Sequence, residues 1–460
     1  MESLKGRKVV VLGLGDTGLS LARWLSRRKA QVRVADSRAA PPHAQTLARE
    51  LPQVKLASGA FSEKTFSGAD LIAISPGIDR RESVIAGAVK RGVPAVGDVE
   101  LFAQALPESR AHGARVLAVT GSNGKSTVTA MAGAMCRAAG RKTAVAGNIG
   151  VPVLDALTAI EEGAAAPEVF VLELSSFQLE STASLAPDAA TVLNVSEDHL
   201  DRYDGMSEYA AAKARIFSGG GVQILNRDDR LTLDMARAGR TLCTFGLAAP
   251  RGESEWGIAS DGARALAHGA HQLMAVDELP LAGLHNAANA LAAHALAHAI
   301  GLPDEPLVGA LRDFRGLPHR MQKVAEIAGV AFYDDSKGTN VGATVAALSG
   351  MNRTVVLIAG GDGKGQDFAP LAPAVRERAR AVVLIGRDAV LIEKALAGSG
   401  VAPIHAGDMD DAVAAAFDAT RPGDAVLLSP ACASYDMFRD YVQRAGAFVA
   451  AVRNLEKRRS

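Results

Sequence analysis

Short runs rich in β-branched residues recur along the chain, and each is followed by a segment with helical spacing. This alternation is typical of parallel sheets covered by helices on both faces. The runs are apolar without strict alternation, as strands buried on both sides require. We therefore expect an α/β protein. The predicted strands are Lys8–Leu12, Gln31–Ala35, Leu71–Ser75, Arg115–Thr120, Val169–Glu173, Thr191–Val195, Thr354–Ala359, Ala381–Ile385 and Ala425–Ser429.

Length and turn-rich breaks divide the chain into three parts. At roughly 150 residues per domain, a chain of 460 residues is expected to form three domains. Breaks at 107–113 and 316–318 predict domains at residues 1–111, 112–317 and 318–460. Residues 239–280 are expected to be irregular or a β-ribbon within the second domain.

Charge and composition limit the partners. Lys+Arg and Asp+Glu both number 50, so no long-range field attracts nucleic acid or an anionic membrane. The three cysteines are far apart, without disulfide or zinc spacing, which fits a reducing compartment. The N-terminus lacks a signal-peptide pattern, and no apolar run reaches the ~18 residues of a membrane span. We expect a cytoplasmic protein that neither inserts into membranes nor binds nucleic acid.

A first glycine loop, Gly13–Gly18, follows a strand and opens a helix predicted over Leu19–Arg28. Its glycines and free N–H groups suit a pyrophosphate, and Asp36 ends the next strand. The pattern alone leaves three interpretations open: an NAD(P) site, another nucleotide site, or a plain tight turn. The segment 75–77 ends a strand on the same expected edge, either as a second wall or as a simple turn.

A second glycine loop, Val119–Thr127, lies between a strand and a helix predicted to reach Ala139. It resembles a P-loop, although Val119 stands where the first glycine would be. Lys125 can reach β- and γ-phosphates, and the Ser126 hydroxyl can bind Mg²⁺. The alternative is a glycine-rich turn, which the order strand, loop, lysine, hydroxyl, helix disfavours.

Carboxylates and a histidine follow two further strands. Glu173 ends an apolar strand, where P-loop enzymes place a metal-binding acid; the alternative is an acid favoured by a helix dipole. The ionisable segment 194–202 contains His199, a candidate metal or substrate ligand that could also be a hydrogen-bonded loop histidine. Lys213 lies in a helical sequence and by itself reads as a surface lysine.

Together these segments resemble a known family. TGSNGKST, LELSSFQLE, NVSEDHLDRY followed by AAKARIF, and LHNAANALAA resemble the Mur ligases and their folylpolyglutamate synthetase relatives. In the last third, GLPHRMQ, YDDSKGTN, GGDGKG and SPACASYDMF resemble the members that add D-glutamate. The likeness covers nearly the whole chain, with the motifs in the same order.

The resemblance implies three α/β domains: an N-terminal Rossmann-like domain that binds UDP, a central P-loop ATPase-like domain with a parallel sheet, and a C-terminal Rossmann-like domain that closes over the site. It implies ATP-dependent addition of D-glutamate to UDP-N-acetylmuramoyl-L-alanine through an acyl phosphate, giving ADP and phosphate, in peptidoglycan precursor synthesis. UDP then replaces the dinucleotide as the expected ligand of Gly13–Gly18. Two Mg²⁺ ions, small-molecule partners and a monomer are also expected.

The resemblance carries over to individual positions. The catalytic set is Lys125, Glu173, His199 and Lys213. The metal set is Ser126, Glu173, His199 and Lys213, with Lys213 at a position that the family carbamylates. A carbamate offers a carboxylate-like oxygen to a hard cation. The ATP set is Gly121, Ser122, Asn123, Gly124, Lys125, Ser126, Thr127, Asn286, Asn289, Arg320, Asp335 and Lys337.

Two further sets concern the other substrates. The set for the UDP substrate is Gly15, Asp16, Thr17, Ser37, Arg38, Ser75, Pro76, Gly77 and Asn148. The D-glutamate set is Lys337, Thr339, Lys364, Ser434 and Tyr441. Cationic lysines and a hydroxyl are what a dicarboxylate needs. Two positions stand apart: the family varies at Asp16, and Phe is familiar at Tyr441.

Other functions remain as alternatives. One is a sister ligase that adds another amino acid, or a folate-polyglutamating enzyme. Another is an NAD(P)-dependent dehydrogenase built on Gly13–Gly18, which leaves Lys125, Glu173 and His199 unexplained. A third is a nucleotide sensor without catalysis, which needs no complete metal set.

Overall fold

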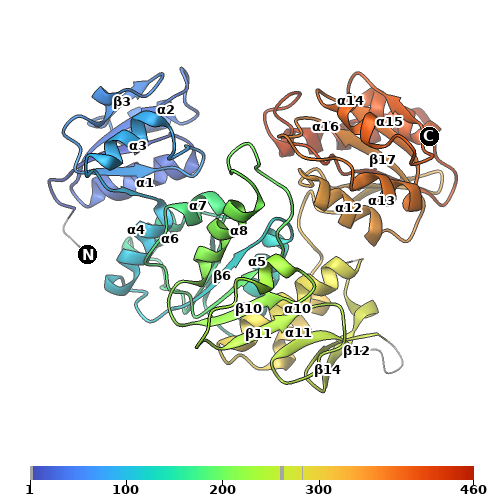
Figure 1. Ribbon diagram of the computed structural model, residues 1–460, viewed down its shortest axis with the longest axis horizontal. Helices are drawn as coiled ribbons and strands as arrows, with labels where there is room; N and C mark the ends of the chain where they lie inside the picture. Colours follow the sequence, from blue (N-terminus) through green and yellow to red (C-terminus); the bar gives the residue numbers. More distant parts are fainter. Residues whose placement is uncertain (1–3, 260–263, 282, 460) are drawn as a thin grey trace.

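A computed structural model describes residues 4–259, 264–281 and 283–459. It contains three α/β domains, each built on its own sheet, so the expected fold class is confirmed. In Figure 1 the N-terminal domain (blue) and the C-terminal domain (orange to red) both lie above the central domain (cyan to yellow), one at the left and one at the right. All nine predicted strands are present; three match to the residue, and the ends of the other six shift by one to three residues.

The N-terminal sheet is fully parallel, with strand order β3-β2-β1-β4-β5. The order reverses between β1 and β4, and ligands of open α/β sheets bind at such a switch point. The loops after these two strands are the first glycine loop and the segment 75–77. The elements are β1 (Lys8–Leu12), α1 (Asp16–Arg27), β2 (Gln31–Asp36), α2 (Ala44–Glu50), β3 (Lys55–Ser58), η1 (Glu63–Phe66), β4 (Leu71–Ile74), α3 (Ser83–Lys90) and β5 (Ala95–Val96).

The central sheet has nine strands in the order β14-β13-β12-β11-β10-β9-β6-β8-β7. It is parallel from β7 to β12, and the β12-β13-β14 edge is antiparallel, which confirms the ribbon expected within 239–280. The strands are β6 (Arg115–Thr120), β7 (Thr143–Gly147), β8 (Val169–Glu173), β9 (Ala189–Val192), β10 (Val222–Asn226), β11 (Leu242–Phe245), β12 (Glu255–Ala259), β13 (Ala265–His268) and β14 (His271–Ala275).

Helices cover both faces of this sheet because successive β6 side chains point to opposite sides. Leu117 and Val119 pack with α5, α10 and α11, whereas Val116 and Ala118 pack toward α4 and α6. The helices are α4 (Asp98–Ala105), η2 (Leu106–Glu108), α5 (Lys125–Ala138), α6 (Val153–Glu161), α7 (Ser176–Glu180), α8 (Met206–Ala214), η3 (Arg215–Phe217), α9 (Arg230–Leu233), η4 (Val276–Glu278), α10 (Leu284–Ala299) and α11 (Asp304–Asp313).

One predicted strand is displaced. The prediction Thr191–Val195 corresponds to β9, which begins and ends earlier, at Ala189–Val192. After β9 the Val195 N–H donates to the Asp229 carboxylate, at 2.7 Å, instead of to a neighbouring strand. This side-chain bond ends the ladder and releases segment 194–202 toward the second glycine loop.

The C-terminal sheet has the order β15-β16-β20-β17-β18-β19, antiparallel only at β15-β16. Among the described helices, none combines the length and apolar character needed to cross a membrane. The elements are β15 (Gln322–Ile327), β16 (Val330–Asp334), α12 (Val341–Gly350), β17 (Val355–Gly360), α13 (Leu371–Arg378), β18 (Ala379–Ile385), α14 (Ala389–Ala395), β19 (Pro403–His405), α15 (Met409–Asp418), β20 (Ala425–Leu428) and α16 (Tyr441–Arg459).

Candidate active site

The second glycine loop connects β6 to α5 and requires glycine at its end. Gly124 has φ of 83°, a left-handed conformation that side chains disfavour. A Cβ there would also lie 2.5 Å from the Asn289 side-chain oxygen. Because α5 begins at Lys125, its free N–H groups face the loop and form an anion-binding nest.

Two lysines converge on this loop from different helices. Lys125 Nζ donates to the Gly121 carbonyl at 2.8 Å, and Lys213 Nζ donates to the same oxygen at 2.9 Å. Lys213 is buried, and this burial holds its pKa well below the usual range. Burial also lowers the pKa of Lys125. Lys213 is therefore not the surface lysine that its local sequence indicates.

Glu173 ends β8 directly beside the P-loop strand, opposite Val119 in the register. Its Oε1 accepts a hydrogen bond from Asn148 Nδ2 at 2.7 Å. Its Oε2 is buried and has no hydrogen-bond partner among the described residues. A buried, unpaired carboxylate oxygen is costly and is a hard ligand of the kind that Mg²⁺ prefers. The donor set thus fits a magnesium ion.

His199 lies in segment 194–202 with a positive φ of 57°. Its ring packs against Phe177, with 4.7 Å between centroids, and its Nε2 is 3.6 Å from Asp198 Oδ2. Burial lowers the pKa of His199 to about 4. The imidazole is therefore neutral at pH 7, which is the form that binds metals.

Asp198 is a central residue that the sequence analysis missed. Its Oδ1 is 2.5 Å from Lys364 Nζ, and its Oδ2 accepts from Asn340 Nδ2 at 3.2 Å. Burial alone would raise the Asp198 pKa, but the charge and hydrogen bond of Lys364 outweigh it, with a further contribution from the charge of Lys125, and the net pKa is lowered. The run of ionisable residues in 194–202 indicated a functional segment, but it did not indicate which of these residues contacts the C-terminal domain.

Cationic side chains of the C-terminal domain contact the P-loop directly. Arg320 and Lys337 each approach Ser126 Oγ, both at 3.2 Å, and Asn340 Nδ2 donates to Asn123 Oδ1 at 3.0 Å. Burial lowers the Lys337 pKa to about 8. The C-terminal domain thus covers the P-loop in this structure.

The remaining residues expected at ATP also face this region. Asn289 Nδ2 donates to Asn286 Oδ1 at 3.2 Å, which places both on one face of α10 beside Gly124. Asp335 is buried, with its Oδ2 accepting from Ser429 Oγ at 2.8 Å. Burial raises the Asp335 pKa to about 6.

The residues expected at D-glutamate come from three neighbouring loops. Lys337 and Thr339 share the loop after β16, and Lys337 Nζ lies 5.3 Å from the Tyr441 ring. The loop of Lys364 pairs with that of Ser434 through Asp362 N and Ala433 O, 3.0 Å apart. The structure therefore brings these five residues to one edge of the C-terminal sheet.

Buried Arg444 is a second residue missed by sequence analysis. Its guanidinium donates to Cys432 O at 3.0 Å and to Ser336 O at 2.9 Å. It thereby holds together two of the three loops. Its signal, a single arginine in a helix, is no different from that of a surface arginine.

The residues expected at UDP are mostly at the switch point of the N-terminal sheet. Ser75 Oγ donates to Gly13 O at 3.2 Å. Arg38 pairs with Asp36, at 2.6 Å, while Asp16 is exposed and contacts His43 at 2.7 Å. Gly15 and Thr17 belong to the same loop, and Ser37 and Gly77 are exposed beside it.

Arg202 connects this edge to the segment that carries His199, whereas Asn148 lies apart from it. Asn148 lies on the central sheet beside Glu173, away from the rest of its group. Arg202 donates to Pro76 O at 3.4 Å and also pairs with Glu180 at 2.8 Å. The N-terminal domain therefore contacts segment 194–202, which also carries His199.

Fold and geometry define a three-domain α/β nucleotide-binding protein whose central P-loop is covered by cationic side chains of the C-terminal domain. Three family models match in order: "Mur ligase MurD-like, N-terminal domain" at residues 7–97, "Mur ligase middle domain" at 119–297 and "Mur ligase, glutamate ligase domain" at 319–432. The chain belongs to the Mur ligase family.

Curated relatives match over full length. A UDP-N-acetylmuramoylalanine--D-glutamate ligase from Thiobacillus denitrificans is 60% identical, covering 99% of this chain and 98% of its own. A protein of the same name from Methylobacillus flagellatus is 57% identical, covering 100% and 99%. Among solved structures, UDP-N-acetylmuramate-alanine ligase MurC from Thermotoga maritima has a TM-score of 0.61 and 19% identity, covering 97% and 99%. That likeness concerns the fold.

Proposed function

We propose that this protein is the ATP-dependent ligase that joins D-glutamate to UDP-N-acetylmuramoyl-L-alanine in peptidoglycan precursor synthesis. One observation supports this most: Lys125 and Lys213 converge on the Gly121 carbonyl of the P-loop, and Arg320 and Lys337 of the C-terminal domain reach Ser126 in the same loop. Glu173 pairs in register with Val119 at the start of that loop, and His199 lies within reach of the charges of both lysines. Full-length relatives with that name support the choice of substrates. The alternative dehydrogenase and sensor functions leave this set of residues unused.

A carboxylate does not accept an amine directly because its leaving group is poor. In the proposed route the L-alanyl carboxylate attacks the γ-phosphorus of ATP, and the bond to the β-phosphate oxygen breaks. The D-glutamate amine then attacks the acyl carbon, and phosphate leaves. Lys125, Arg320 and Lys337 neutralise charge on the phosphates. The C-terminal domain, which covers the P-loop, keeps water from the acyl phosphate.

Four residues would hold two Mg²⁺ ions: Ser126, Glu173, His199 and Lys213. The bound metal supplies charge neutralisation at the transferring phosphoryl group. Lys213 suits carbamylation because burial lowers the pKa of its amine well below the usual range, which favours the neutral, nucleophilic form. The neutral amine would attack CO₂, forming an N–C bond and releasing one proton. The product is an anionic oxygen ligand.

The other substrates are proposed to bind on either side of the P-loop. The uridine diphosphate would lie at the switch point formed by Gly13–Gly18 and 75–77. The five-residue set of the C-terminal sheet would hold both D-glutamate carboxylates. We also propose domain boundaries at residues 1–111, 112–317 and 318–460, a cytoplasmic location and a monomeric state.

The test is phosphate release from ATP with UDP-N-acetylmuramoyl-L-alanine as acceptor. D-glutamate, L-glutamate, L-alanine and a diamino acid are compared, with a folate acceptor as a separate arm. We expect phosphate release with D-glutamate alone. Preference for another amino acid, or for the folate acceptor, would replace this proposal with a sister activity. Nicotinamide-cofactor binding without phosphate release would favour the dehydrogenase alternative.

A further inference from the structure

A cluster of histidines lies at the end of α10 that is remote from the P-loop. Asn286 and His298 are twelve positions apart on this helix, a rise of roughly 18 Å. His298 lies in its last turn, Asp304 begins α11, and His268 ends β13. The cluster is therefore separate from the proposed active site.

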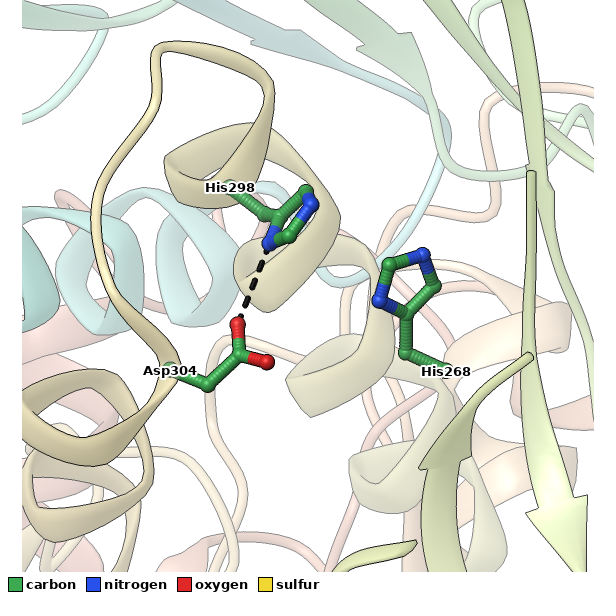
Figure 2. Close-up of side chains that lie close together, drawn as sticks. All are labelled: His268, His298 and Asp304. Atoms are coloured by element: carbon green, nitrogen blue, oxygen red, sulfur yellow. Dashed lines mark hydrogen bonds and ion pairs between the residues drawn. The ribbon is translucent and has the colours of Figure 1, made fainter. Parts of the chain in front are cut away.

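These three side chains point toward a common centre (Figure 2). One ligand atom from each lies within 4.8 Å of the other two. His298 Nδ1 is 3.0 Å from Asp304 Oδ1. Nδ1 of His268 is the ring nitrogen directed at this pair, while Nε2 points away (Figure 2).

Hydrogen bonding determines which nitrogen of His268 can bind a cation. Its Nε2 is 2.6 Å from the Glu253 carbonyl oxygen, which can only accept. Nε2 therefore carries the hydrogen, and the Nδ1 lone pair is available toward the centre. Metal-binding histidines commonly donate their other N–H to a backbone carbonyl in this way.

Buried His294 supports the carboxylate from behind. Trp256 Nε1 donates to His294 Nδ1 at 3.0 Å, so His294 carries its hydrogen on Nε2. That Nε2 is fully buried, has no hydrogen-bond partner among the described residues, and lies 3.4 Å from Asp304 Oδ1. A small shift of Asp304 toward a cation would leave His294 placed to orient the carboxylate.

We propose that His268, His298 and Asp304 form a binding site for a divalent transition-metal ion of the Zn²⁺ class. Two imidazole nitrogens and one carboxylate suit zinc, whereas Mg²⁺ prefers oxygen ligands. The His298 and Asp304 side chains are 39% and 29% exposed, which gives the ion access and leaves room for a water ligand. On binding through Nδ1, His298 gives up its Nδ1 hydrogen to solvent and carries a hydrogen on Nε2 instead, taken from solvent, so that a neutral imidazole holds the ion.

The aromatic packing around the site keeps its ligands in place. The Trp256 and His268 rings stack at 3.9 Å and 8°, and the His268 and His298 rings are 4.6 Å apart. Packing alone would need no carboxylate at the centre. An ion here would tie the antiparallel β12–β14 edge to helices α10 and α11, which stabilises the central domain.

The test is zinc binding by the chelator-treated full chain in saturating Mg²⁺, measured by equilibrium dialysis and thermal unfolding. The variants are His298→Asn and Asp304→Asn. The matched control is His405→Asn, from an exposed histidine–carboxylate pair with His405 Nε2 3.0 Å from Glu393. A His199→Asn background separates any ion bound at the proposed active site. Co²⁺ absorption provides a readout of the ligand field.

We expect one zinc ion per chain in wild type, His405→Asn and the His199→Asn background. Either site variant should weaken zinc binding by at least about tenfold. Zinc should raise the unfolding midpoint of wild type by a few degrees, and of the site variants by less. Should His298→Asn fold poorly, Asp304→Asn carries the comparison because it preserves side-chain size. Equal zinc binding by wild type and Asp304→Asn, or no zinc in wild type, would overturn the proposal.

Discussion

The two glycine loops occupy equivalent places between a parallel strand and a helix, but their electrostatic surroundings differ. Each follows a parallel strand, opens a helix and needs glycine: a Cβ on Gly18 would lie 1.8 Å from Gly13 O, much as one on Gly124 would meet Asn289. Two carboxylates belong to the surroundings of the first loop: Asp16 is part of the loop, and Asp36 accepts a hydrogen bond from Leu14 N at 2.6 Å. The hydrogen bond from Arg38 lowers the Asp36 pKa to about 2. The second loop has basic side chains from two domains: Lys125 and the buried Lys213 from α5 and α8, and the partly buried Arg320 and Lys337 from the C-terminal domain.

Loop shape and loop chemistry are therefore separate properties. Backbone N–H groups suffice to hold a pyrophosphate in place. Transfer of a phosphoryl group also needs positive charge where charge moves in the transition state. We therefore expect substitutions at the second loop to affect turnover, and substitutions at the first loop to affect binding of the sugar nucleotide.

The largest effect is expected for Lys125→Ala. Loss of the lysine that reaches the phosphates should reduce ATP turnover by about 10³-fold or more. Phosphate release is the measurement, and Lys90→Ala, at an exposed position of α3, is the control. Near-normal turnover would refute the P-loop role and remove the contrast between the loops.

Lys213→Ala should lower turnover by at least about 10²-fold, because a ligand to the second metal is lost. Short carboxylates such as formate should restore part of the activity by supplying the missing oxygen. Lys213→Arg, which keeps a long nitrogen-bearing side chain but cannot be carbamylated, should be equally inactive. Full activity in either variant would exclude the metal role.

Lys364→Ala should raise the KM for D-glutamate by about tenfold, the effect of losing one charge-assisted hydrogen bond. The KM values for ATP and for the acceptor should change less. Lys394→Ala, on exposed α14, is the matched control. An unchanged KM would mean that Lys364 serves only its ion pair with Asp198.

Nucleotide affinity should fall above pH 8. The Lys337 pKa is about 8 because of burial, and an anion binds the protonated form, so affinity is complete below this pH and declines as pH rises through it. Between pH 7 and 8.5 a non-hydrolysable ATP analogue should bind about fourfold more weakly. Lys337→Arg should remove the dependence. An equal decline in Lys337→Arg would place the titrating group elsewhere.

The smallest effect is expected at the first loop, for Asp16→Ala. Its side chain is 85% exposed and contacts His43, and exposed pairs contribute little. The KM for the UDP substrate should stay within about twofold of wild type. A tenfold rise would show that this loop also depends on a side-chain charge.

Sequence patterns predicted the local elements because those depend on neighbouring residues. Strands β1, β6 and β8 match their predictions to the residue, and the P-loop follows from its order of strand, lysine and helix. The end of β9 was misplaced, since Asp229 terminates that strand from a distant position. The resemblance to a family supplied roles that spacing alone left open, above all for Lys213.

Contacts between distant segments could not be predicted. Lys364 and Asp198 are separated by 166 positions, and Arg444 reaches back 108 positions to Ser336. Such pairs depend on how sheets pack together, which no local pattern encodes. The tautomers of His268 and His294 likewise become clear only once their partners in space are known.

The crowding of cations over Ser126 has a consequence for the catalytic cycle. Burial lowers the pKa of Lys125 and of Lys337, and the nearby charge of Arg320 lowers both further, so like charges oppose the covered arrangement. A polyanion bound between the central and C-terminal domains would offset this repulsion, and its departure would restore it. We therefore expect product release and separation of these two domains to occur together, and to slow as added salt screens the repulsion.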